Sequence, residues 1–173
     1  SEGRVIGVNA QIESGSSLVR ANAGVGFAIP VNIVKRVVPA LIAEGHYDHA
    51  WLGISGQTYS PSWAKELRLP EDVRGAYVMY VEPAGPADQA GVKAGTKRTD
   101  VLLGLDNFNQ PIYLAAGGDL ITAINDQPVR KFDDLLVYLE RYSSPGDRVE
   151  LTVLRSSGKQ EIISVKLGKR PEG

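Results

Sequence analysis

The side chains able to perform acid–base or nucleophilic chemistry are few in this sequence. Its only histidines are His46 and His49, close together near the end of the first third of the chain. Ser14, Ser16 and Ser17 lie in a stretch rich in Ser, Gly and Asn, outside any Gly-x-Ser-x-Gly pattern of a nucleophile elbow. A serine hydrolase needs a nucleophile, a base and an orienting acid within hydrogen-bond reach. We therefore predict no catalytic residue in this chain.

The two histidines also raise the question of a metal site. His46-Tyr47-Asp48-His49 combines two imidazoles and a carboxylate, and both groups bind zinc. A structural zinc site normally has four ligands, and the sequence offers no cysteine and no third histidine. We expect neither a metal nor another cofactor.

The composition is that of an ordinary globular protein. The 173 residues are 43% hydrophobic and 23% charged, with a formal net charge of −1. This charge gives no reason to expect binding to nucleic acid or to a membrane surface. No apolar stretch approaches the roughly 18 residues of a transmembrane helix, so we expect no such segment in this chain. The chain opens like a turn that enters a strand, so we expect a fragment and infer nothing from the missing signal peptide.

The first part of the chain contains two predicted strands and a helix. β-type runs at 5–8 and 25–29 predict the strands. Apolar residues at helical spacing predict a helix over 31–45, ended by a glycine. Pro39 falls inside this pattern, where we expect a kink or a weak point. Residues 46–50 are predicted to be a short linker.

Residues 51–170 have the pattern of one compact α+β domain. The clearest helix covers 131–142, with two aspartates in its first turn. A shorter helix is predicted around 62–67, with Ser62 as its cap. Two apolar runs between 96 and 117 flank a turn-rich centre and predict an inserted hairpin. Apolar runs bounded by turn residues predict strands at 75–81, 120–124, 149–154 and 162–167, the last two as a hairpin.

Three motifs connect these elements. They are Val81-Glu82-Pro83-Ala84-Gly85-Pro86-Ala87, Gly118-Asp119-Leu120-Ile121-Thr122-Ala123-Ile124-Asn125 and Pro145-Gly146-Asp147. Their order, with a small helix after the first and a longer helix after the second, resembles a PDZ domain of the HtrA/Deg serine protease family. The resemblance implies a PDZ-type, partly open β-barrel with two helices.

The N-terminal part resembles the same family. Gly3-Arg4-Val5-Ile6-Gly7-Val8-Asn9 and Gly24-Val25-Gly26-Phe27-Ala28-Ile29-Pro30 are similar to the last two strands of the HtrA protease barrel, and 31–45 to its C-terminal helix. The resemblance implies that residues 1–45 are the C-terminal end of a trypsin-like domain. In the family, the nucleophile motif Gly-Asn-Ser-Gly-Gly falls shortly before the position of Ser1. The parent protein is then a trypsin-like serine endopeptidase, and we expect this chain alone to be inactive.

The segment Ala50-Trp51-Leu52-Gly53-Ile54 matches the family's aromatic-apolar-Gly-apolar carboxylate-binding loop. A glycine permits an unusual backbone turn in which consecutive N–H groups converge on one anion. The resemblance implies that Leu52, Gly53 and Ile54 capture the C-terminal carboxylate of a peptide. The strand that starts at Ile54 and Ser55 then pairs with the peptide backbone. The alternative is that Trp51, Leu52 and Ile54 are core residues of a strand.

In a PDZ fold the helix 132–142 forms the far wall of the peptide groove. We expect Leu135 and Leu139 to line the pocket for the last peptide side chain, and Phe132 and Leu136 to turn toward the core. A one-sided apolar stripe on its own is most often a core-packing face.

The resemblance also implies partners and a location. The partners are the C-termini of peptides or unfolded proteins, with a possible trimer-based homo-oligomer and no nucleic acid. The location is extracytoplasmic, in a periplasm or cell envelope, whereas the chain itself does not reveal it. Two functions remain open: a module that serves protein quality control by a protease, and an adaptor or oligomerisation PDZ domain that binds a partner without delivering substrate.

Overall fold

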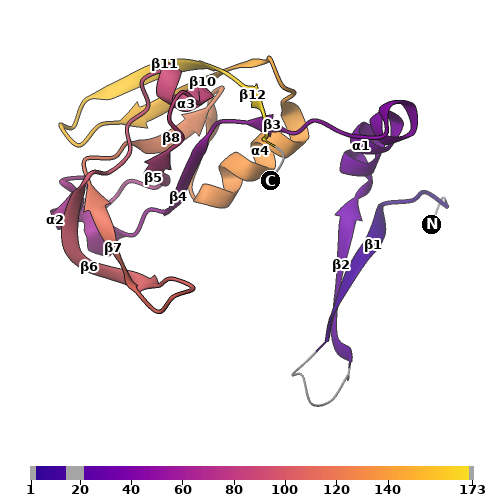
Figure 1. Ribbon diagram of the computed structural model, residues 1–173, viewed down its shortest axis with the longest axis horizontal. Helices are drawn as coiled ribbons and strands as arrows, with labels where there is room; N and C mark the ends of the chain where they lie inside the picture. Colours follow the sequence, from indigo (N-terminus) through magenta and orange to yellow (C-terminus); the bar gives the residue numbers. More distant parts are fainter. Residues whose placement is uncertain (1–2, 15–21, 172–173) are drawn as a thin grey trace. The chain divides into compact units, whose positions relative to one another are not determined.

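The computed structural model describes residues 3–14 and 22–171, and it forms two compact units that divide between residues 47 and 48 (Figure 1). Ser16 and Ser17, in the predicted polar loop, lie outside the described residues.

The first unit is a β-hairpin followed by a helix, as predicted. The helix starts where the second strand ends, and there the Val31 N–H donates to the Ile6 carbonyl at 2.9 Å. Because the second strand ends at Pro30, which pairs with Gly7, Val5 and Ile6 precede the first strand, and the strand predicted at 5–8 begins later than expected. The elements are β1 (Gly7–Ser14), its antiparallel partner β2 (Asn22–Pro30) and α1 (Val31–Glu44).

Helix α1 ends at the predicted glycine. Gly45 has a left-handed conformation with φ of 76°, and its N–H donates to the Leu41 carbonyl at 3.1 Å. The helix continues on both sides of Pro39, so the expected weak point does not end it. No residue of α1 is buried, and Ile42 is 81% exposed. Within its own unit, α1 therefore leaves apolar side chains uncovered.

The second unit is built on a central sheet with strand order β11-β10-β8-β5-β4. The strands predicted from apolar runs are confirmed to within two residues at each end. This sheet contains β4 (Ile54–Thr58), β5 (Ala76–Val81), β8 (Leu120–Ile124), β9 (Gln127–Pro128), β10 (Arg148–Leu154) and β11 (Gln160–Lys166). Two smaller pairs are β3 (Ala50–Trp51) with β12 (Gly168–Lys169), and β6 (Lys97–Leu105) with β7 (Pro111–Ala116).

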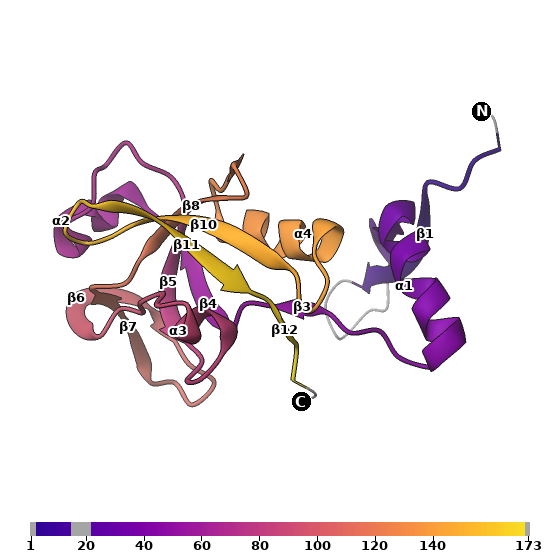
Figure 2. The ribbon, with the colours of Figure 1, turned by 90° about the horizontal axis from the view of Figure 1, so that it is seen from above.

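The two faces of the central sheet carry different apolar clusters, because successive side chains of a strand point to opposite faces. On β5, Ala76 and Val78 join the cluster that contains Leu135 of helix α4 (Phe132–Tyr142), whereas Tyr77 joins a cluster with Leu114 of β7. Helix α4 and the β6–β7 hairpin accordingly lie on different sides of the sheet (Figure 2). The sheet is thus a two-sided scaffold.

The predicted hairpin within 96–117 forms as β6 and β7, and a buried tyrosine ties its base to the sheet. The Tyr77 hydroxyl donates to the Ala115 carbonyl at 2.7 Å and accepts from the Gly118 N–H at 3.0 Å. Burial raises the pKa of this hydroxyl above its ordinary value. The far end of the hairpin is exposed, with Phe108 at 84% and Leu102 at 56%.

The helical segment predicted around 62–67 begins differently from the expectation. It consists of a 3-10 turn η1 (Pro61–Trp63) followed by α2 (Ala64–Leu67). Ser62 is therefore inside the turn and caps nothing, and its hydroxyl lies 2.8 Å from that of Ser60. A proline favours the first helical position, so Pro61 moves the start of the segment upstream.

Candidate functional site

The predicted loop residues Trp51 to Ser55 connect β3 to β4 and lie together in the structure. Leu52 is 2% exposed and Gly53 is buried, whereas Ser55 is exposed on β4. Gly53 has φ of +75°, a conformation that favours glycine. An added Cβ there would lie 3.3 Å from both Pro86 Cδ and Trp51 Cη2. The glycine predicted from the motif is therefore required by both its conformation and its close neighbours.

Two backbone hydrogen bonds fix the direction of the loop's peptide groups. The Ala87 N–H donates to the Leu52 carbonyl at 2.9 Å, and the Glu82 N–H donates to the Gly53 carbonyl at 2.8 Å. In a trans peptide the C=O and the following N–H point in opposite directions. Both bonds therefore turn the N–H groups of Gly53 and Ile54 away from Glu82 and Ala87.

Strand β4 offers an unpaired edge next to this loop. It ends the strand order of the central sheet, so in the described part of the chain β5 is its one partner. Because Glu82 N–H binds the carbonyl of Gly53, Ile54 and Val81 form a non-hydrogen-bonded pair of the β4–β5 ladder. The N–H and carbonyl of Ile54 thus face the open edge.

Helix α4 is attached to the other end of β4. The Phe132 N–H, at the start of α4, donates to Thr58 Oγ1 at 3.0 Å. A Cβ on Gly56 would lie 3.0 Å from the Phe132 ring. The two aspartates lie in the first turn of α4 as predicted. Asp134 Oδ2 also accepts from the N–H of Lys131 at 3.1 Å and so caps the helix.

The apolar residues of α4 divide differently from the expectation. Leu135 and Leu139 are 1% and 8% exposed and belong to the core cluster that also contains Leu52. Phe132 packs against that cluster as predicted, but Leu136 is 52% exposed, so its predicted core position is wrong. The inner stripe of a helix follows i and i+4 spacing, and Leu136 is turned about 100° away from Leu135.

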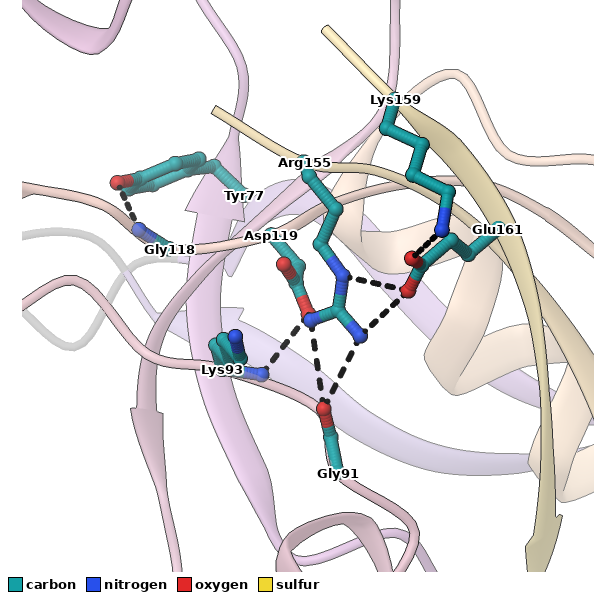
Figure 3. A network of polar contacts seen from close by, with 8 residues as sticks. All are labelled: Tyr77, Gly91, Lys93, Gly118, Asp119, Arg155, Lys159 and Glu161. Carbon is teal, nitrogen blue, oxygen red and sulfur yellow. Dashed lines mark hydrogen bonds and ion pairs between the residues drawn. The ribbon is translucent and has the colours of Figure 1, made fainter. Parts of the chain in front are cut away.

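An ionic network with a buried aspartate lies beside the turn that follows α3 (Pro86–Gln89) (Figure 3). Asp119 is 1% exposed, and its Oδ2 lies 2.6 Å from Arg155 Nη1. Arg155 also binds Glu161 Oε2, whose carboxylate takes a second ion pair from Lys159 at 2.7 Å. Burial lowers the pKa of Arg155, but its bonds to Asp119 and Glu161 raise it more, so it lies above its ordinary value. Donors from Lys159 and Arg155 lower the pKa of Glu161.

Asp119 of the Gly118-Asp119 motif binds the turn after α3, because its Oδ2 accepts from the Lys93 N–H at 2.8 Å. Arg155 was not predicted from the sequence, because there it resembles the many other charged residues of a protein surface. The sequence contained one signal, the aspartate of the Gly118-Asp119 motif. A carboxylate that becomes buried needs a cation as its partner.

The histidines are engaged in other contacts. His49 Nδ1 lies 3.0 Å from Glu140 Oε2, and His46 Nδ1 lies 3.1 Å from the Glu44 carbonyl. Over residues 3–14 and 22–171, no group of three or more His, Cys, Asp or Glu residues is placed to hold a metal ion. Across the same residues, no helix has the length and apolar character needed to cross a membrane.

Comparison with known proteins identifies the class. A family model described as PDZ domain matches residues 50–167, and the chain therefore belongs to the PDZ domain family. The relatives are HtrA-type proteases, which confirms the resemblance seen in the sequence.

Individual relatives match nearly the whole chain. A probable periplasmic serine endoprotease, DegP-like, of Rhizobium meliloti is 32% identical over 98% of this chain and 28% of its own length. The chloroplastic Protease Do-like 1 of Arabidopsis thaliana is 34% identical over 99% of this chain and 34% of its own. The solved structure of the HtrA-type protease AlgW with decapeptide has a TM-score of 0.70 at 26% identity, covering 99% of this chain and 44% of that one. The chain thus spans about a third or less of the length of these curated relatives.

Proposed function

We propose that residues 51–170 are the peptide-binding PDZ module of an HtrA-like serine endopeptidase, and that it binds the free C-terminus of a peptide or unfolded protein. The observation that carries this proposal is the pair of hydrogen bonds to the carbonyls of Leu52 and Gly53, which leaves two adjacent N–H groups directed the other way. Successive backbone N–H groups that point to one place suit an anion such as a carboxylate.

The peptide adds to the sheet as a further strand in this proposal. Its carboxylate accepts from the loop that includes Leu52, Gly53 and Ile54, and its backbone pairs with Ile54 and the open edge of β4 beyond it. Trp51 flanks the glycine, and Ser55 lies on the edge strand. The last peptide side chain packs between β4 and α4, above the buried Leu135 and Leu139.

The wider context is proposed from the relatives. Residues 1–45 form the C-terminal end of a trypsin-like domain, and the segment at 96–117 is an insertion. The linker predicted at 46–50 shortens to 46–49, because Ala50 belongs to β3. The hairpin and helix of the first unit, and the division between residues 47 and 48, support the proposed protease end and linker. The catalytic triad belongs to the parent endopeptidase, which acts in protein quality control in an extracytoplasmic compartment, as a homo-oligomer.

A second function is favoured by one specific observation. The far end of the β6–β7 hairpin exposes Phe108 at 84%, Leu102 at 56%, Leu105 at 56% and Ile112 at 41%. Contiguous exposed apolar side chains mark interaction surfaces in soluble proteins. An adaptor or oligomerisation PDZ domain that uses this hairpin, without delivering substrate, is the alternative.

The test compares one peptide sequence as the free acid and as the C-terminal amide. A set of dye-labelled decapeptides ending in Ala, Val, Leu or Phe is titrated with the 173-residue chain by fluorescence anisotropy. A charge-assisted hydrogen bond contributes roughly 1.5–3 kcal/mol, so amidation should weaken binding about tenfold to a hundredfold. Equal binding of acid and amide contradicts terminus recognition. Loss of self-association or of partner binding on Phe108→Ser, with no acid preference, would favour the adaptor function.

A further inference from the structure

We propose that Asp119 and Arg155 are positioning residues for the carboxylate-binding loop, and that they act through the turn after α3. This inference rests on the peptide-binding function proposed above. In this inference, a buried ion pair that is not part of the loop contributes to the affinity for a free C-terminus.

Asp119 holds the chain just after α3 at two points. Its own N–H donates to the Lys93 carbonyl at 2.9 Å, and its side-chain Oδ2 accepts from the Lys93 N–H at 2.8 Å. The backbone of Lys93 is thus bound on both sides by a residue that is itself 1% exposed. The main-chain carbonyl of Asp119 accepts from the Val78 N–H of β5, and this bond attaches Asp119 and Lys93 to the central sheet.

Arg155 binds the same turn at Gly91, two residues before Lys93 in the chain. Its Nη1 and Nη2 both donate to the Gly91 carbonyl, at 3.3 and 3.2 Å, while Nη1 binds Asp119 (Figure 3). The planar fork of a guanidinium can make these contacts at once, whereas an ammonium is a single point charge. Glu161 fixes the opposite side of the fork through Nε at 3.0 Å. Arg155 therefore joins β10 and β11 to the end of α3.

The turn that the pair holds is continuous with the loop. Val92 N–H donates to the carbonyl of Ala87 at 3.0 Å, and Ala87 N–H donates to the carbonyl of Leu52. Pro86, at the start of α3, packs against Gly53. Helix α3 has only four residues, so its own hydrogen bonds cannot fix its position. Its position, and with it the direction of the Gly53 N–H, depends on how both of its ends are held.

The ion pair has the properties of a rigid anchor. The side chains of Asp119 and Arg155 are 1% and 16% exposed, so solvent screens their interaction only weakly. Removing one partner of a buried pair leaves an uncompensated charge and is strongly destabilising. A conservative change that keeps the charge is therefore the informative one.

The main variant is Arg155→Lys, which keeps the cation beside Asp119 but loses the fork to the Gly91 carbonyl. The matched control is Lys159→Met, in the same network but paired with Glu161 instead of the turn after α3. Near-UV circular dichroism and a urea titration establish that each variant is folded. Affinities for the acid and amide peptides, and amide NMR resonances of Gly53 and Ile54, are then compared with the wild type.

We expect Arg155→Lys to bind the acid peptide about threefold to thirtyfold more weakly, with little change for the amide, since network substitutions alter coupling by such factors. The Gly53 and Ile54 resonances should move in Arg155→Lys and stay in place in Lys159→Met. A folded Arg155→Lys protein with full acid preference and unmoved resonances overturns the positioning role and leaves peptide binding intact. A wild-type chain without acid preference overturns peptide binding itself.

A measurement on the wild-type chain decides the question if Arg155→Lys does not fold. Coupling between two sites is reciprocal, so a ligand on the loop must also stabilise the turn that positions it. The acid peptide should slow hydrogen exchange of the Lys93 amide, and the amide peptide should not. Unchanged exchange of Lys93 with saturating acid peptide refutes the inference.

Discussion

Replacing Gly53 with alanine tests whether the loop needs glycine for its conformation alone or also for its close neighbours. A left-handed conformation costs a non-glycine residue roughly 1–2 kcal/mol. At Gly53 the new methyl group would also lie 3.3 Å from Pro86 Cδ and Trp51 Cη2. Both neighbours are rings, which yield less readily than flexible chains, and overpacking of this kind adds roughly 1 kcal/mol or more. We expect Gly53→Ala to lower the free energy of unfolding by about 2–4 kcal/mol.

Gly158 provides the matched control. It has φ of +83°, similar to Gly53, but an added Cβ would meet nothing within 4 Å. Gly158→Ala should therefore carry the conformational cost alone, about 1–2 kcal/mol. Both free energies come from urea titrations, with an unchanged m-value required for the comparison.

Peptide affinity separates the two glycines further. Gly53→Ala should bind the free-acid peptide about tenfold more weakly, because a shifted loop misplaces N–H donors to a charged acceptor. Gly158→Ala, in the β10–β11 turn, should bind it like the wild type. Equal destabilisation of the two variants, with acid-peptide affinity unchanged in both, would refute the argument from close packing at the loop.

Other expectations concern stability. Tyr77→Phe should lower the free energy of unfolding by about 1–3 kcal/mol, because a buried N–H and a part-buried carbonyl lose their partner. Tyr80→Phe, whose hydroxyl is exposed, should change little. Leu135→Ala should cost about 2–5 kcal/mol and Leu136→Ala less than about 0.5, both measured by urea titration. The folded-state pKa of Glu161 is lowered from 4.5, so its contribution is present above that pH and is lost as pH falls through the lower folded value. Glu161→Gln should therefore flatten the stability profile below pH 4.5, and an unchanged slope there would contradict this.

The elements that local sequence determines were predicted well. Along β10, Val149, Leu151 and Val153 are all buried at alternate positions, which is the period of a strand with one covered face. Helix α4 follows from its apolar spacing and its aspartates. In both cases the signal lies in neighbouring residues, so no knowledge of distant contacts is needed.

The errors arise where a distant or neighbouring contact overrides the local pattern. Val5 and Ile6 are good strand residues, yet β1 begins only at Gly7, because its partner strand β2 ends at Pro30, the residue that pairs with Gly7. Leu136 belongs to an apolar stripe, yet the sheet covers only the side of α4 that carries Leu135 and Leu139. Arg155 resembles any surface cation until the fold brings it to Asp119, 36 residues away in the chain.

The loop at Gly53, which is proposed to bind a carboxylate, combines both situations. The sequence reveals Gly53 and the turn it permits, but a turn alone does not decide which way its N–H groups point. That direction depends on the amides of Glu82 and Ala87, which lie at the two ends of the motif Glu82-Pro83-Ala84-Gly85-Pro86-Ala87. The prolines and the glycine between them bend the chain so that both amides reach consecutive carbonyls of the loop. The motif that signalled the family in the sequence is therefore also the physical support of its proposed binding site.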